Sequence, residues 1–336
     1  MSELVAVVGA GSWGTTLANL LAKKGHRVRL WSFETDVTEA INDGRENTVY
    51  LPAVRLDENL SATSSLGEAV DGAEVVVSVS PSQHVRGVMQ EAASSLRKDA
   101  LVVSASKGIE TKTLETMAEV LEDVLPAGMH RSLCFLSGPS FAAEVSQEHP
   151  TAVTVAARDT AAARRAQALF QTDYFRVYTS HDVIGVELGG ALKNVMALAA
   201  GMATGLGFGH NTRAALITRG LAEMSRLGST LGANPLTFMG LAGMGDLILT
   251  CTGDLSRNRS VGVALGEGRT LTEVLSEMRM VAEGVETSRA AHALAQREEV
   301  EMPIVDEVHA VLFEERAPEA AVRNLMEREP KAELWS

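Results

Sequence analysis

Three stretches of this 336-residue chain carry side chains whose types and spacing suit chemistry on a small anionic molecule. The first is the turn Gly9-Ala10-Gly11-Ser12-Trp13-Gly14, which follows the apolar run Leu4–Val8 and precedes the helix-like stretch Thr15–Lys24. In such a turn the first glycine permits a tight bend, the second lets the backbone approach a pyrophosphate, and the third lets helix and strand pack closely. The positive end of the helix dipole then faces the phosphates. The turn therefore predicts a dinucleotide site that includes all three glycines. A glycine-rich turn without a ligand is the alternative.

The sequence leaves the choice between NAD and NADP open. An acidic residue about 20 positions beyond the turn binds the ribose hydroxyls and favours NAD. Glu34 stands at that distance from Gly14, but the residue that directly follows the apolar run Val28–Trp31 is Ser32, which does not repel a 2′-phosphate. Phe33 and Tyr50 are candidates to line an adenine pocket, with ordinary loop packing as the equal alternative.

The second signal is a pair of lysines in different parts of the chain. Lys107 follows the apolar run Leu101–Ala105, and ligands of an open parallel sheet bind beyond the carboxyl ends of its strands. Lys193 and Asn194 interrupt an apolar, helix-like stretch, where an unpaired lysine is costly to bury. Burial and a second cation lower the pKa of a lysine from about 10.4 toward neutrality, which suits proton exchange with a substrate hydroxyl. We expect Lys193 to be that acid–base group and Asn194 to hold its geometry. The alternatives are a solvated Lys107 and a Lys193 that only reaches a helix-end carbonyl.

The third signal lies between Gly243 and Arg259, where small residues and hydroxyls surround one or two arginines. This composition suits a phosphate dianion, because Arg257 can bind it through two hydrogen bonds while Asn258 and Ser256 donate others. Asp246 fits there only if it orients a lysine or a substrate hydroxyl. The alternative is that Ser256 is simply the N-cap of a solvated helix.

The elements that position these residues follow from hydrophobic patterning. From residue 4 to about residue 180, valine-rich apolar runs alternate with amphipathic stretches, which indicates a doubly wound, largely parallel sheet of the Rossmann type. From Asp182 onward the spacing is helical throughout. We therefore expect a dinucleotide-binding domain at residues 1–180 and an all-helical substrate domain at residues 181–336. The expected strands are Leu4–Val8, Val28–Trp31, Val75–Val79, Leu101–Ala105, Leu133–Leu136, Val153–Ala156 and Phe175–Tyr178. The expected helices include Thr15–Lys24, Ser82–Leu96, Thr113–Val124, Thr160–Phe170, Thr270–Met278, Ser288–Gln296, Ile304–Phe313 and Ala320–Glu327.

Composition narrows the function classes. A formal net charge of −13 argues against nucleic acid as a partner, because such a surface repels polyphosphate. The two cysteines, Cys134 and Cys251, cannot build a disulfide framework or a four-ligand zinc site, and we expect no metal. The apolar stretch Val195–Gly209 is too short and too rich in glycine for a membrane span, and no basic region precedes the first apolar run. We expect a cytoplasmic protein without membrane insertion.

Taken together, these stretches resemble the bacterial NAD(P)-dependent sn-glycerol-3-phosphate dehydrogenases nearly from end to end. The Gly-Pro-Ser-Phe-Ala block at residues 138–142 and the Gly-Gly-Ala-Leu-Lys-Asn block at residues 189–194 are the most specific. The resemblance implies a Rossmann domain followed by a helical domain like the C-terminal domain of 6-phosphogluconate dehydrogenase. It also implies the interconversion of dihydroxyacetone phosphate and sn-glycerol 3-phosphate with NADH or NADPH, in a homodimer that supplies glycerophospholipid synthesis. The resembling segments are Gly9–Gly14, Ala105–Gly108, Ser137–Ala142, Ile184–Val195, Gly207–Leu227, Ala242–Thr252, Ser256–Arg259 and Val281–Gly284.

The resemblance further implies roles for single residues. Lys193 matches the proton acceptor, and Lys107 matches a residue that contacts both coenzyme and substrate. Relatives often carry histidine or arginine where this chain has Phe33, so a preference for NADP does not follow and either coenzyme is expected to serve. The substrate positions that match are Gly138, Ser140, Asp246, Ser256, Arg257 and Asn258, which Asn194 and Thr250 adjoin. The coenzyme positions that match are Ser12, Trp13, Ala142, Val281 and Glu283, with Arg257 placed to touch both ligands.

Two other function classes remain open at this point. A β-hydroxyacid dehydrogenase also joins a dinucleotide domain to a helical domain with a catalytic lysine, but its substrates carry a carboxylate in place of the phosphate. A coenzyme-sensing protein that has lost catalysis is the other, although the presence of Lys107, Lys193 and Asp246 argues against it. Oxidation of NADH or NADPH in the presence of dihydroxyacetone phosphate separates the three.

Overall fold

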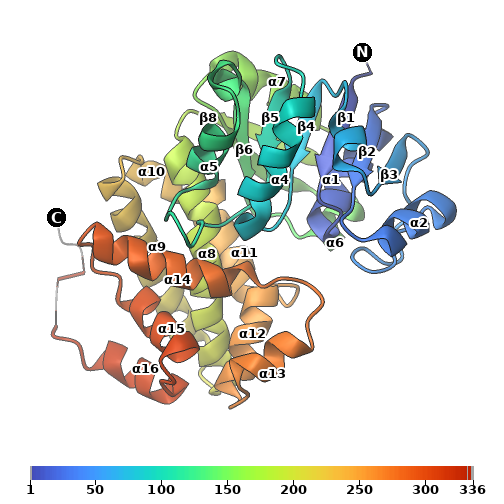
Figure 1. Cartoon of the computed structure of the whole chain (residues 1–336). Coiled ribbons are helices and arrows are strands. Elements are labelled where there is room, and N and C mark those ends of the chain that lie inside the picture. Colours follow the sequence, from blue (N-terminus) through green and yellow to red (C-terminus); the bar gives the residue numbers. More distant parts are fainter. Residues whose placement is uncertain (1, 331, 334–336) are drawn as a thin grey trace.

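The structure is a computed structural model that describes residues 2–330 and 332–333. An eight-stranded sheet with helices on both faces forms the N-terminal part, and a cluster of helices forms the rest (Figure 1). The strand order is β3-β2-β1-β4-β5-β6-β7-β8, and β6–β7 is the antiparallel pair in an otherwise parallel sheet. The strands are β1 (Leu4–Val8), β2 (Arg27–Trp31), β3 (Leu60–Thr63), β4 (Val75–Ser78), β5 (Leu101–Ser104), β6 (Leu133–Ser137), β7 (Thr151–Ala156) and β8 (Phe175–Ser180).

Burial on both faces explains the continuous apolar runs of the central strands. In β1, Val5 and Val7 belong to the core on one face of the sheet, while Ala6 and Val8 belong to the core on the other face. The predicted α/β class with a helical C-terminal part is confirmed. The helices that cover the sheet are α1 (Ser12–Lys23), α2 (Thr35–Gly44), α3 (Leu66–Val70), α4 (Val85–Ala92), α5 (Met117–Val124), α6 (Ala142–Ser146) and α7 (Thr160–Phe170).

The long helix α8 (Val183–Gly205) runs through the centre of the helical part and is mostly buried. Its glycines allow a very close crossing with α12, since a Cβ on Gly201 would lie 2.2 Å from the carbonyl oxygen of Arg259. This crossing fixes the start of α12 beside α8. The other helices are α9 (His210–Thr230), α10 (Pro235–Phe238), the π-helical segment η4 (Leu241–Gly245), α11 (Asp246–Thr252), α12 (Arg257–Gly266), α13 (Leu271–Ser276), α14 (Glu283–Arg297), α15 (Pro303–Phe313) and α16 (Pro318–Met326).

Three details differ from the sequence-based prediction. The strand β3 and the helices beside it were not predicted, because β3 lies at the sheet edge, alternates buried and exposed residues, and lacks a valine run. The helix expected from Thr113 begins only at Met117, because Thr116 and Glu119 form a capping box at its start. The stretch Ser82–Leu96 is divided into η1 (Ser82–His84), α4 and η2 (Ala93–Ser95).

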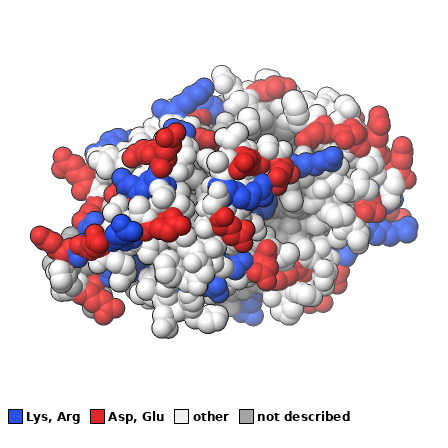
Figure 2. Space-filling model, turned by 90° about the horizontal axis from the view of Figure 1, so that it is seen from below, with Lys and Arg blue, Asp and Glu red and all other residues white. Residues whose placement is uncertain are grey.

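Two helical stretches, Val183–Gly205 and Pro235–Thr252, are long and apolar enough to span a membrane by composition alone. The first is 89 % buried inside the protein, which identifies it as the core helix of the helical part. The second consists of the consecutive elements α10, η4 and α11. On the face of the molecule in Figure 2, acidic and basic side chains are interspersed.

Candidate active site

The glycine turn between β1 and α1 is built for close approach. Gly9 has φ of +122°, and its N–H donates to the carbonyl oxygen of Trp31 at 3.1 Å. A Cβ on Gly14 would lie 1.9 Å from the carbonyl oxygen of Gly9, whereas a Cβ on Gly11 would meet no described atom within 4 Å. Gly9 and Gly14 are thus required by the protein's own packing, while Gly11 faces open space at the start of α1. These residues fit the pyrophosphate of a dinucleotide, which binds at a helix N-terminus and needs an unobstructed backbone.

The other predicted coenzyme residues of this region surround the turn. The hydroxyl of Ser12 donates to the carbonyl oxygen of Tyr50 at 2.5 Å and lies 3.3 Å from the sulfur of Met280. The ring of Trp13 contacts the ring of Phe175, with 6.4 Å between the two centroids. The carbonyl oxygen of Ala142, at the start of α6, accepts a hydrogen bond from Thr16 of α1.

A buried cluster of two lysines around one aspartate joins the two parts of the molecule. Lys107 Nζ donates to Asp246 Oδ2, and Lys193 Nζ donates to Asp246 Oδ1, each at 2.6 Å. Lys193 also donates to Thr250 Oγ1 at 2.9 Å, and Lys107 to the carbonyl oxygen of Gly138 at 3.2 Å. The hydroxyl of Thr250 donates its single proton to the carbonyl oxygen of Asp246, so a lone pair is free to accept from Lys193. Asp246 therefore orients both lysines, which is the first of the two roles that the sequence left open for it.

Electrostatics separate the roles of these three groups. Burial lowers the pKa of Lys193 to about 8; the charge of Asp246 opposes this effect and the cation of Lys107 adds to it. Burial alone would raise the pKa of Asp246, but the two ammonium groups outweigh it and hold the pKa below its usual value. The cluster therefore keeps an ionised carboxylate next to a lysine whose proton is exchangeable near neutral pH.

Local structure explains how the cluster forms. Asp246 and Thr250 are four residues apart at the start of α11 and so share one face of that helix. The pair Gly189 and Gly190 lets α8 approach its neighbours, because Cβ atoms there would lie 2.5 Å from the carbonyl oxygen of Ala242 and 2.6 Å from Ser137 Oγ. Lys193 follows one turn later on α8.

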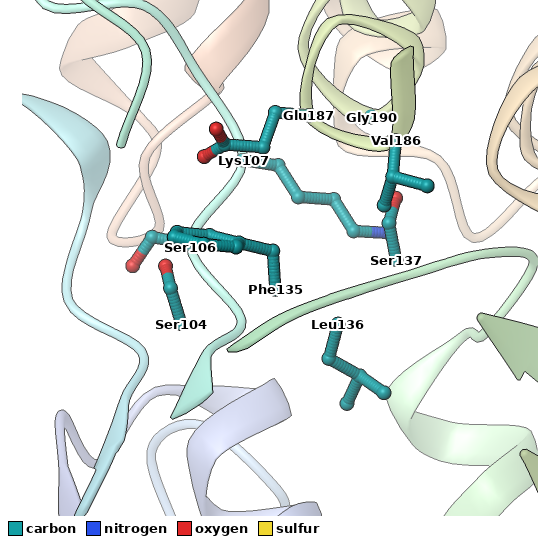
Figure 3. Close-up of a pocket in the computed structure, with 9 residues that line it drawn as sticks. All are labelled: Ser104, Ser106, Lys107, Phe135, Leu136, Ser137, Val186, Glu187 and Gly190. Carbon is teal, nitrogen blue, oxygen red and sulfur yellow. The ribbon is translucent and has the colours of Figure 1, made fainter. Parts of the chain in front are cut away.

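A small cavity of about 10 Å³ lies behind the stem of Lys107, close to the volume that one water molecule needs. Figure 3 shows Lys107 crossing from the end of β5 toward α8, with Ser137 near the end of its side chain. Gly190 lies beside the middle of that side chain, since a Cβ there would lie 3.5 Å from Lys107 Cγ and Cδ. The hydroxyls of Ser104 and Ser137 are buried and have no partner among the described residues. The aliphatic stem of Lys107 is thus enclosed, which leaves only its ammonium end at the cluster.

The predicted phosphate residues lie at the start of α12, next to α8. Ser256 is the N-cap of α12 and accepts a hydrogen bond from the N–H of Arg259, as the alternative predicted. The start of this helix is not solvated, however, because Ser256 and Asn258 are both buried. Asn258 Nδ2 donates to Asn194 Oδ1 at 3.0 Å, which ties α12 to the residue after Lys193. Arg257 donates to the carbonyl oxygen of Val281 at 3.0 Å. Its guanidinium thus stands between the start of α12 and the chain that leads into α14.

Glu283, the first residue of α14, connects the helical part of the molecule to the end of the sheet. Its carboxylate accepts hydrogen bonds from the N–H of Ser82 at 3.1 Å and from the Ser82 hydroxyl at 2.5 Å. Burial raises the pKa of Glu283, and the bonds from Ser82 oppose that rise. A Cβ on Gly108 would lie 2.3 Å from Ser82 Oγ and 3.5 Å from Glu283 Oε2, so Glu283 adjoins the loop of Lys107. The next residue, Gly284, donates its N–H to Asn258 Oδ1 at 2.9 Å.

The structure thus brings the predicted residues together in two connected groups. The first surrounds Asp246, and Ser140 joins it through a hydrogen bond to the carbonyl oxygen of Gly138. The second runs from Asn194 through Asn258 to Glu283 and Arg257. The glycine turn is a separate region that reaches the second group through Met280, next to Val281.

Two residues of this region were missed by the sequence analysis. Ser82 holds Glu283, and a polar residue shortly after the end of β4 was the available signal. Glu187 of α8 accepts hydrogen bonds from the N–H of Ala118, in the first turn of α5, and so joins the two parts of the molecule. Its signal was the same as that of Lys193, a charged residue within an apolar helix.

Both parts of the chain match known proteins in sequence. The family model described as the N-terminus of NAD-dependent glycerol-3-phosphate dehydrogenase matches residues 4–163, and the model for the C-terminus matches residues 182–323. The glycerol-3-phosphate dehydrogenase (NAD(P)+) of Citrifermentans bemidjiense is 59 % identical over 333 residues, which are 99 % of each chain. That of Geobacter sulfurreducens is 58 % identical over 335 residues, covering all of both chains.

Solved structures show the same similarity. A glycerol-3-phosphate dehydrogenase from Coxiella burnetii, 39 % identical, superposes with a TM-score of 0.93 over 97 % of this chain and 99 % of that one. The enzyme from Saccharomyces cerevisiae, 29 % identical, gives a TM-score of 0.81 over 98 % and 100 % of the two chains. A ketopantoate reductase from Ralstonia eutropha, 17 % identical with a TM-score of 0.60, shares the fold alone.

Proposed function

The chain belongs to the NAD-dependent glycerol-3-phosphate dehydrogenase family, and on that premise we propose which of its side chains carry out the reaction. The chain is an NAD(P)-dependent oxidoreductase that interconverts dihydroxyacetone phosphate and sn-glycerol 3-phosphate. Family membership decides against the β-hydroxyacid dehydrogenase and against the inactive coenzyme sensor. The observation that carries the assignment of roles is the position of the buried Asp246 between the buried Lys193 and the partly buried Lys107.

Lys193 is the proton donor in ketone reduction and the proton acceptor in the reverse direction. Two of the three N–H bonds of its ammonium group are used by Asp246 and Thr250, which leaves the third for the oxygen of the substrate. The pKa of about 8 lets this group give up its proton to the developing alkoxide near neutral pH. The bound nicotinamide coenzyme supplies the hydride.

Lys107 and Asp246 set the net charge around Lys193. Together with Lys193 they contain two ammonium groups and one carboxylate, so the cluster keeps one net positive charge facing the substrate oxygen. Preorganised positive charge of this kind stabilises the negative charge that forms on the carbonyl oxygen. Asp246 holds both cations in place, and Lys107 touches both coenzyme and substrate.

The start of α12 binds the phosphate of the substrate. Arg257 supplies a bidentate donor, and Asn258, Ser256 and the helix N-terminus add hydrogen bonds and a favourable dipole. Asn194, which directly follows Lys193, accepts a hydrogen bond from Asn258 and so links the phosphate site to the position of Lys193. Gly138, Ser140 and Thr250 line the substrate between the two groups. Binding energy from the remote phosphate then positions the reacting carbon.

The glycine turn holds the coenzyme. Gly9, Gly11 and Gly14 shape the turn, and the backbone of Ser12 and Trp13 faces the pyrophosphate. The remaining coenzyme contacts in this proposal are Tyr50, Lys107, Ala142, Arg257, Val281 and Glu283.

Substitution of Lys193 tests the central role. Lys193→Ala is expected to lower kcat by about 10²–10⁴ while leaving coenzyme affinity within about twofold. Lys193→Arg is the matched control, because it keeps the charge but cannot release a proton near neutral pH, and it is expected to lose turnover as well. Initial rates of coenzyme oxidation and coenzyme titrations measure both. A Lys193→Ala protein with ordinary turnover would rule out the assignment.

Substitution of Arg257 tests the phosphate grip separately. Arg257→Ala is expected to raise KM for dihydroxyacetone phosphate about tenfold or more, because a charge-assisted bond contributes about 1.5–3 kcal/mol. An unaltered KM would place the phosphate elsewhere.

We place the boundary between the two domains near residue 180, between β8 and α8, where the alternation of strands and helices ends. Three further features of the proposal rest on the family rather than on the geometry. The enzyme works in the cytoplasm as a homodimer, and its product supplies the backbone of glycerophospholipids. Sedimentation of the purified protein tests the dimer.

A further inference from the structure

The loop that carries Tyr50 is fixed to the glycine turn. Asn47 is fully buried, and its amide nitrogen donates to the carbonyl oxygen of Ala10 and to Thr15 Oγ1, each at 2.8 Å. The amide oxygen of Asn47 accepts a hydrogen bond from the N–H of Tyr50 at 3.0 Å, and the carbonyl oxygen of Tyr50 accepts the bond from Ser12. The position of Tyr50 is therefore set by the turn that receives the dinucleotide.

Tyr50 in turn holds a carboxylate at the end of β2. The phenol of Tyr50 donates to Glu34 Oε1 at 2.8 Å, and the hydroxyl of Ser32 lies 3.2 Å from Glu34 Oε2. Burial, followed by the bond to Glu34, raises the pKa of Tyr50 to about 12, so the phenol remains a donor. Ser32 is fully buried and is anchored through its N–H to the carbonyl oxygen of Thr63 in β3. Both oxygens of Glu34 are thus held by residues that the fold has already fixed.

This carboxylate stands where a dinucleotide places its adenosine ribose. The end of β2 is joined to the turn by the bond from Gly9 to Trp31, and an acidic residue beyond β2 binds the ribose diol in folds of this type. We propose that Glu34, positioned by Tyr50 and Ser32, makes this enzyme prefer NADH over NADPH. The ribose hydroxyls donate to the carboxylate, whereas a 2′-phosphate meets like charge. The inference rests on the proposed dinucleotide site at the glycine turn.

The other side chains around the ribose position also favour NADH over NADPH. Phe33, which lies between Ser32 and Glu34, is 83 % exposed and brings no positive charge to this position. Arg29 is engaged by the carbonyl oxygens of Glu68 and Asp71, and Arg45 by the carbonyl oxygen of Leu60.

Two acidic side chains and one basic side chain act on the phenol of Tyr50. Glu34 and Asp36 raise its pKa, whereas Arg279, an exposed residue on the chain between α13 and α14, lowers it. The balance around the ribose position is acidic, which opposes a 2′-phosphate.

Direct binding of the two coenzymes tests the proposal. Calorimetric titration of the whole protein with NADH and with NADPH is expected to show NADH binding at least about tenfold more tightly, since a hydrogen bond to a charged group contributes about 1.5–3 kcal/mol. Glu34→Gln keeps the size and removes the charge, and it is expected to shift the ratio of the two Kd values about tenfold toward NADPH. Glu39→Gln, an exposed glutamate further along α2, is the matched control and is expected to leave the ratio within about twofold.

A second variant keeps the test decisive if Glu34→Gln folds poorly. Phe33→Arg adds a cation at an exposed position, and it is expected to shift the ratio of the two Kd values several-fold toward NADPH. Equal or tighter binding of NADPH by the unmodified protein, or an unchanged ratio in Glu34→Gln, would overturn the role of Glu34 and leave the dinucleotide site intact. Failure of both coenzymes to bind would overturn the dinucleotide site itself, and with it this inference.

Discussion

The two ends of the active site are built in opposite ways. The glycine turn at the coenzyme end consists of six consecutive residues, and the clash that a Cβ on Gly14 would cause involves Gly9, five positions away. The lysine cluster joins Asp246 to residues 53 and 139 positions away in the sequence. The first end is set by the backbone of the turn and by the ends of the neighbouring strands, where a Cβ on Gly9 would lie 2.9 Å from the carbonyl oxygen of Val79. The second end is set by the packing of α11 against α8 and of α8 against the sheet. Substitutions should therefore act on the first end through shape and on the second through charge.

Removal of the shared carboxylate should have the largest effect. Asp246→Asn leaves the buried ammonium group of Lys193 and the partly buried one of Lys107 without their counter-charge, and loss of one partner of a buried ion pair costs about 3–5 kcal/mol. We expect a stability loss of that size, together with a loss of turnover. Chemical denaturation and initial rates measure the two effects.

Thr250→Val is the matched control for the carboxylate, because it removes one neutral acceptor from Lys193 and should cost only about 1 kcal/mol. Equal effects of the two variants would contradict the dominance of charge at this end of the site.

The glycine turn offers a paired test of shape. Gly14→Ala should destabilise the protein by about 1–3 kcal/mol, because the added methyl group meets backbone that cannot move far. Gly11→Ala should leave the stability of the protein unchanged but weaken NADH binding, because its methyl group enters only the space that faces the coenzyme. Thermal unfolding and coenzyme titration of both variants measure these effects. If Gly11→Ala bound NADH normally, the pyrophosphate would have to lie elsewhere.

The pH dependence of turnover should show whether Lys193 is the group that exchanges the proton. The pKa of Lys193 is about 8, so kcat for ketone reduction should fall as the pH rises through 8, while kcat for alcohol oxidation should rise over the same range. Lys107→Met removes a cation that lowers this pKa, so both limbs should move to higher pH. The measurement to compare is the pH at which kcat changes, because the size of kcat also depends on the contacts that Lys107 makes with the substrate. If that pH were the same in Lys107→Met and in the unmodified protein, another group would be titrating.

The last prediction concerns the stability contributed by Glu187, which links the two parts of the molecule. Burial raises its pKa from the usual 4.5 to about 8, so between these pH values the folded protein keeps a proton that the unfolded chain releases. This group therefore makes stability fall as pH rises through that window. Glu187→Gln should match the unmodified protein at pH 5 and exceed its stability at pH 9. Denaturation curves at both pH values test this, and the comparison cancels the similar slope from Glu223.

The same contrast explains what could be read from the sequence. The glycine turn, the central strands and Thr160–Phe170 as a helix were predictable, because each depends on neighbours in the chain. The need of Lys193 and Asp246 for partners was also predictable from the cost of burying charge.

The partners of Ser82 and Glu187 were not predictable, since they lie 201 and 69 positions away. The edge strand β3 was missed because its register is set by β2 rather than by its own four residues. Long-range packing thus accounts for what the sequence did not reveal.

The π-helical segment η4 has a consequence for how this protein can change. Its five residues, Leu241–Gly245, come directly before Asp246 and contain the extra residue per turn that distinguishes a π-helix from an α-helix. Five π-helical residues turn the chain through about the same angle as four α-helical residues, because each π turn takes nearly one residue more. Deletion of one residue there, with an ordinary helix in its place, would therefore leave Asp246 and Thr250 facing both lysines. The segment is thus a place where the chain can lose a residue without moving the charges of the cluster.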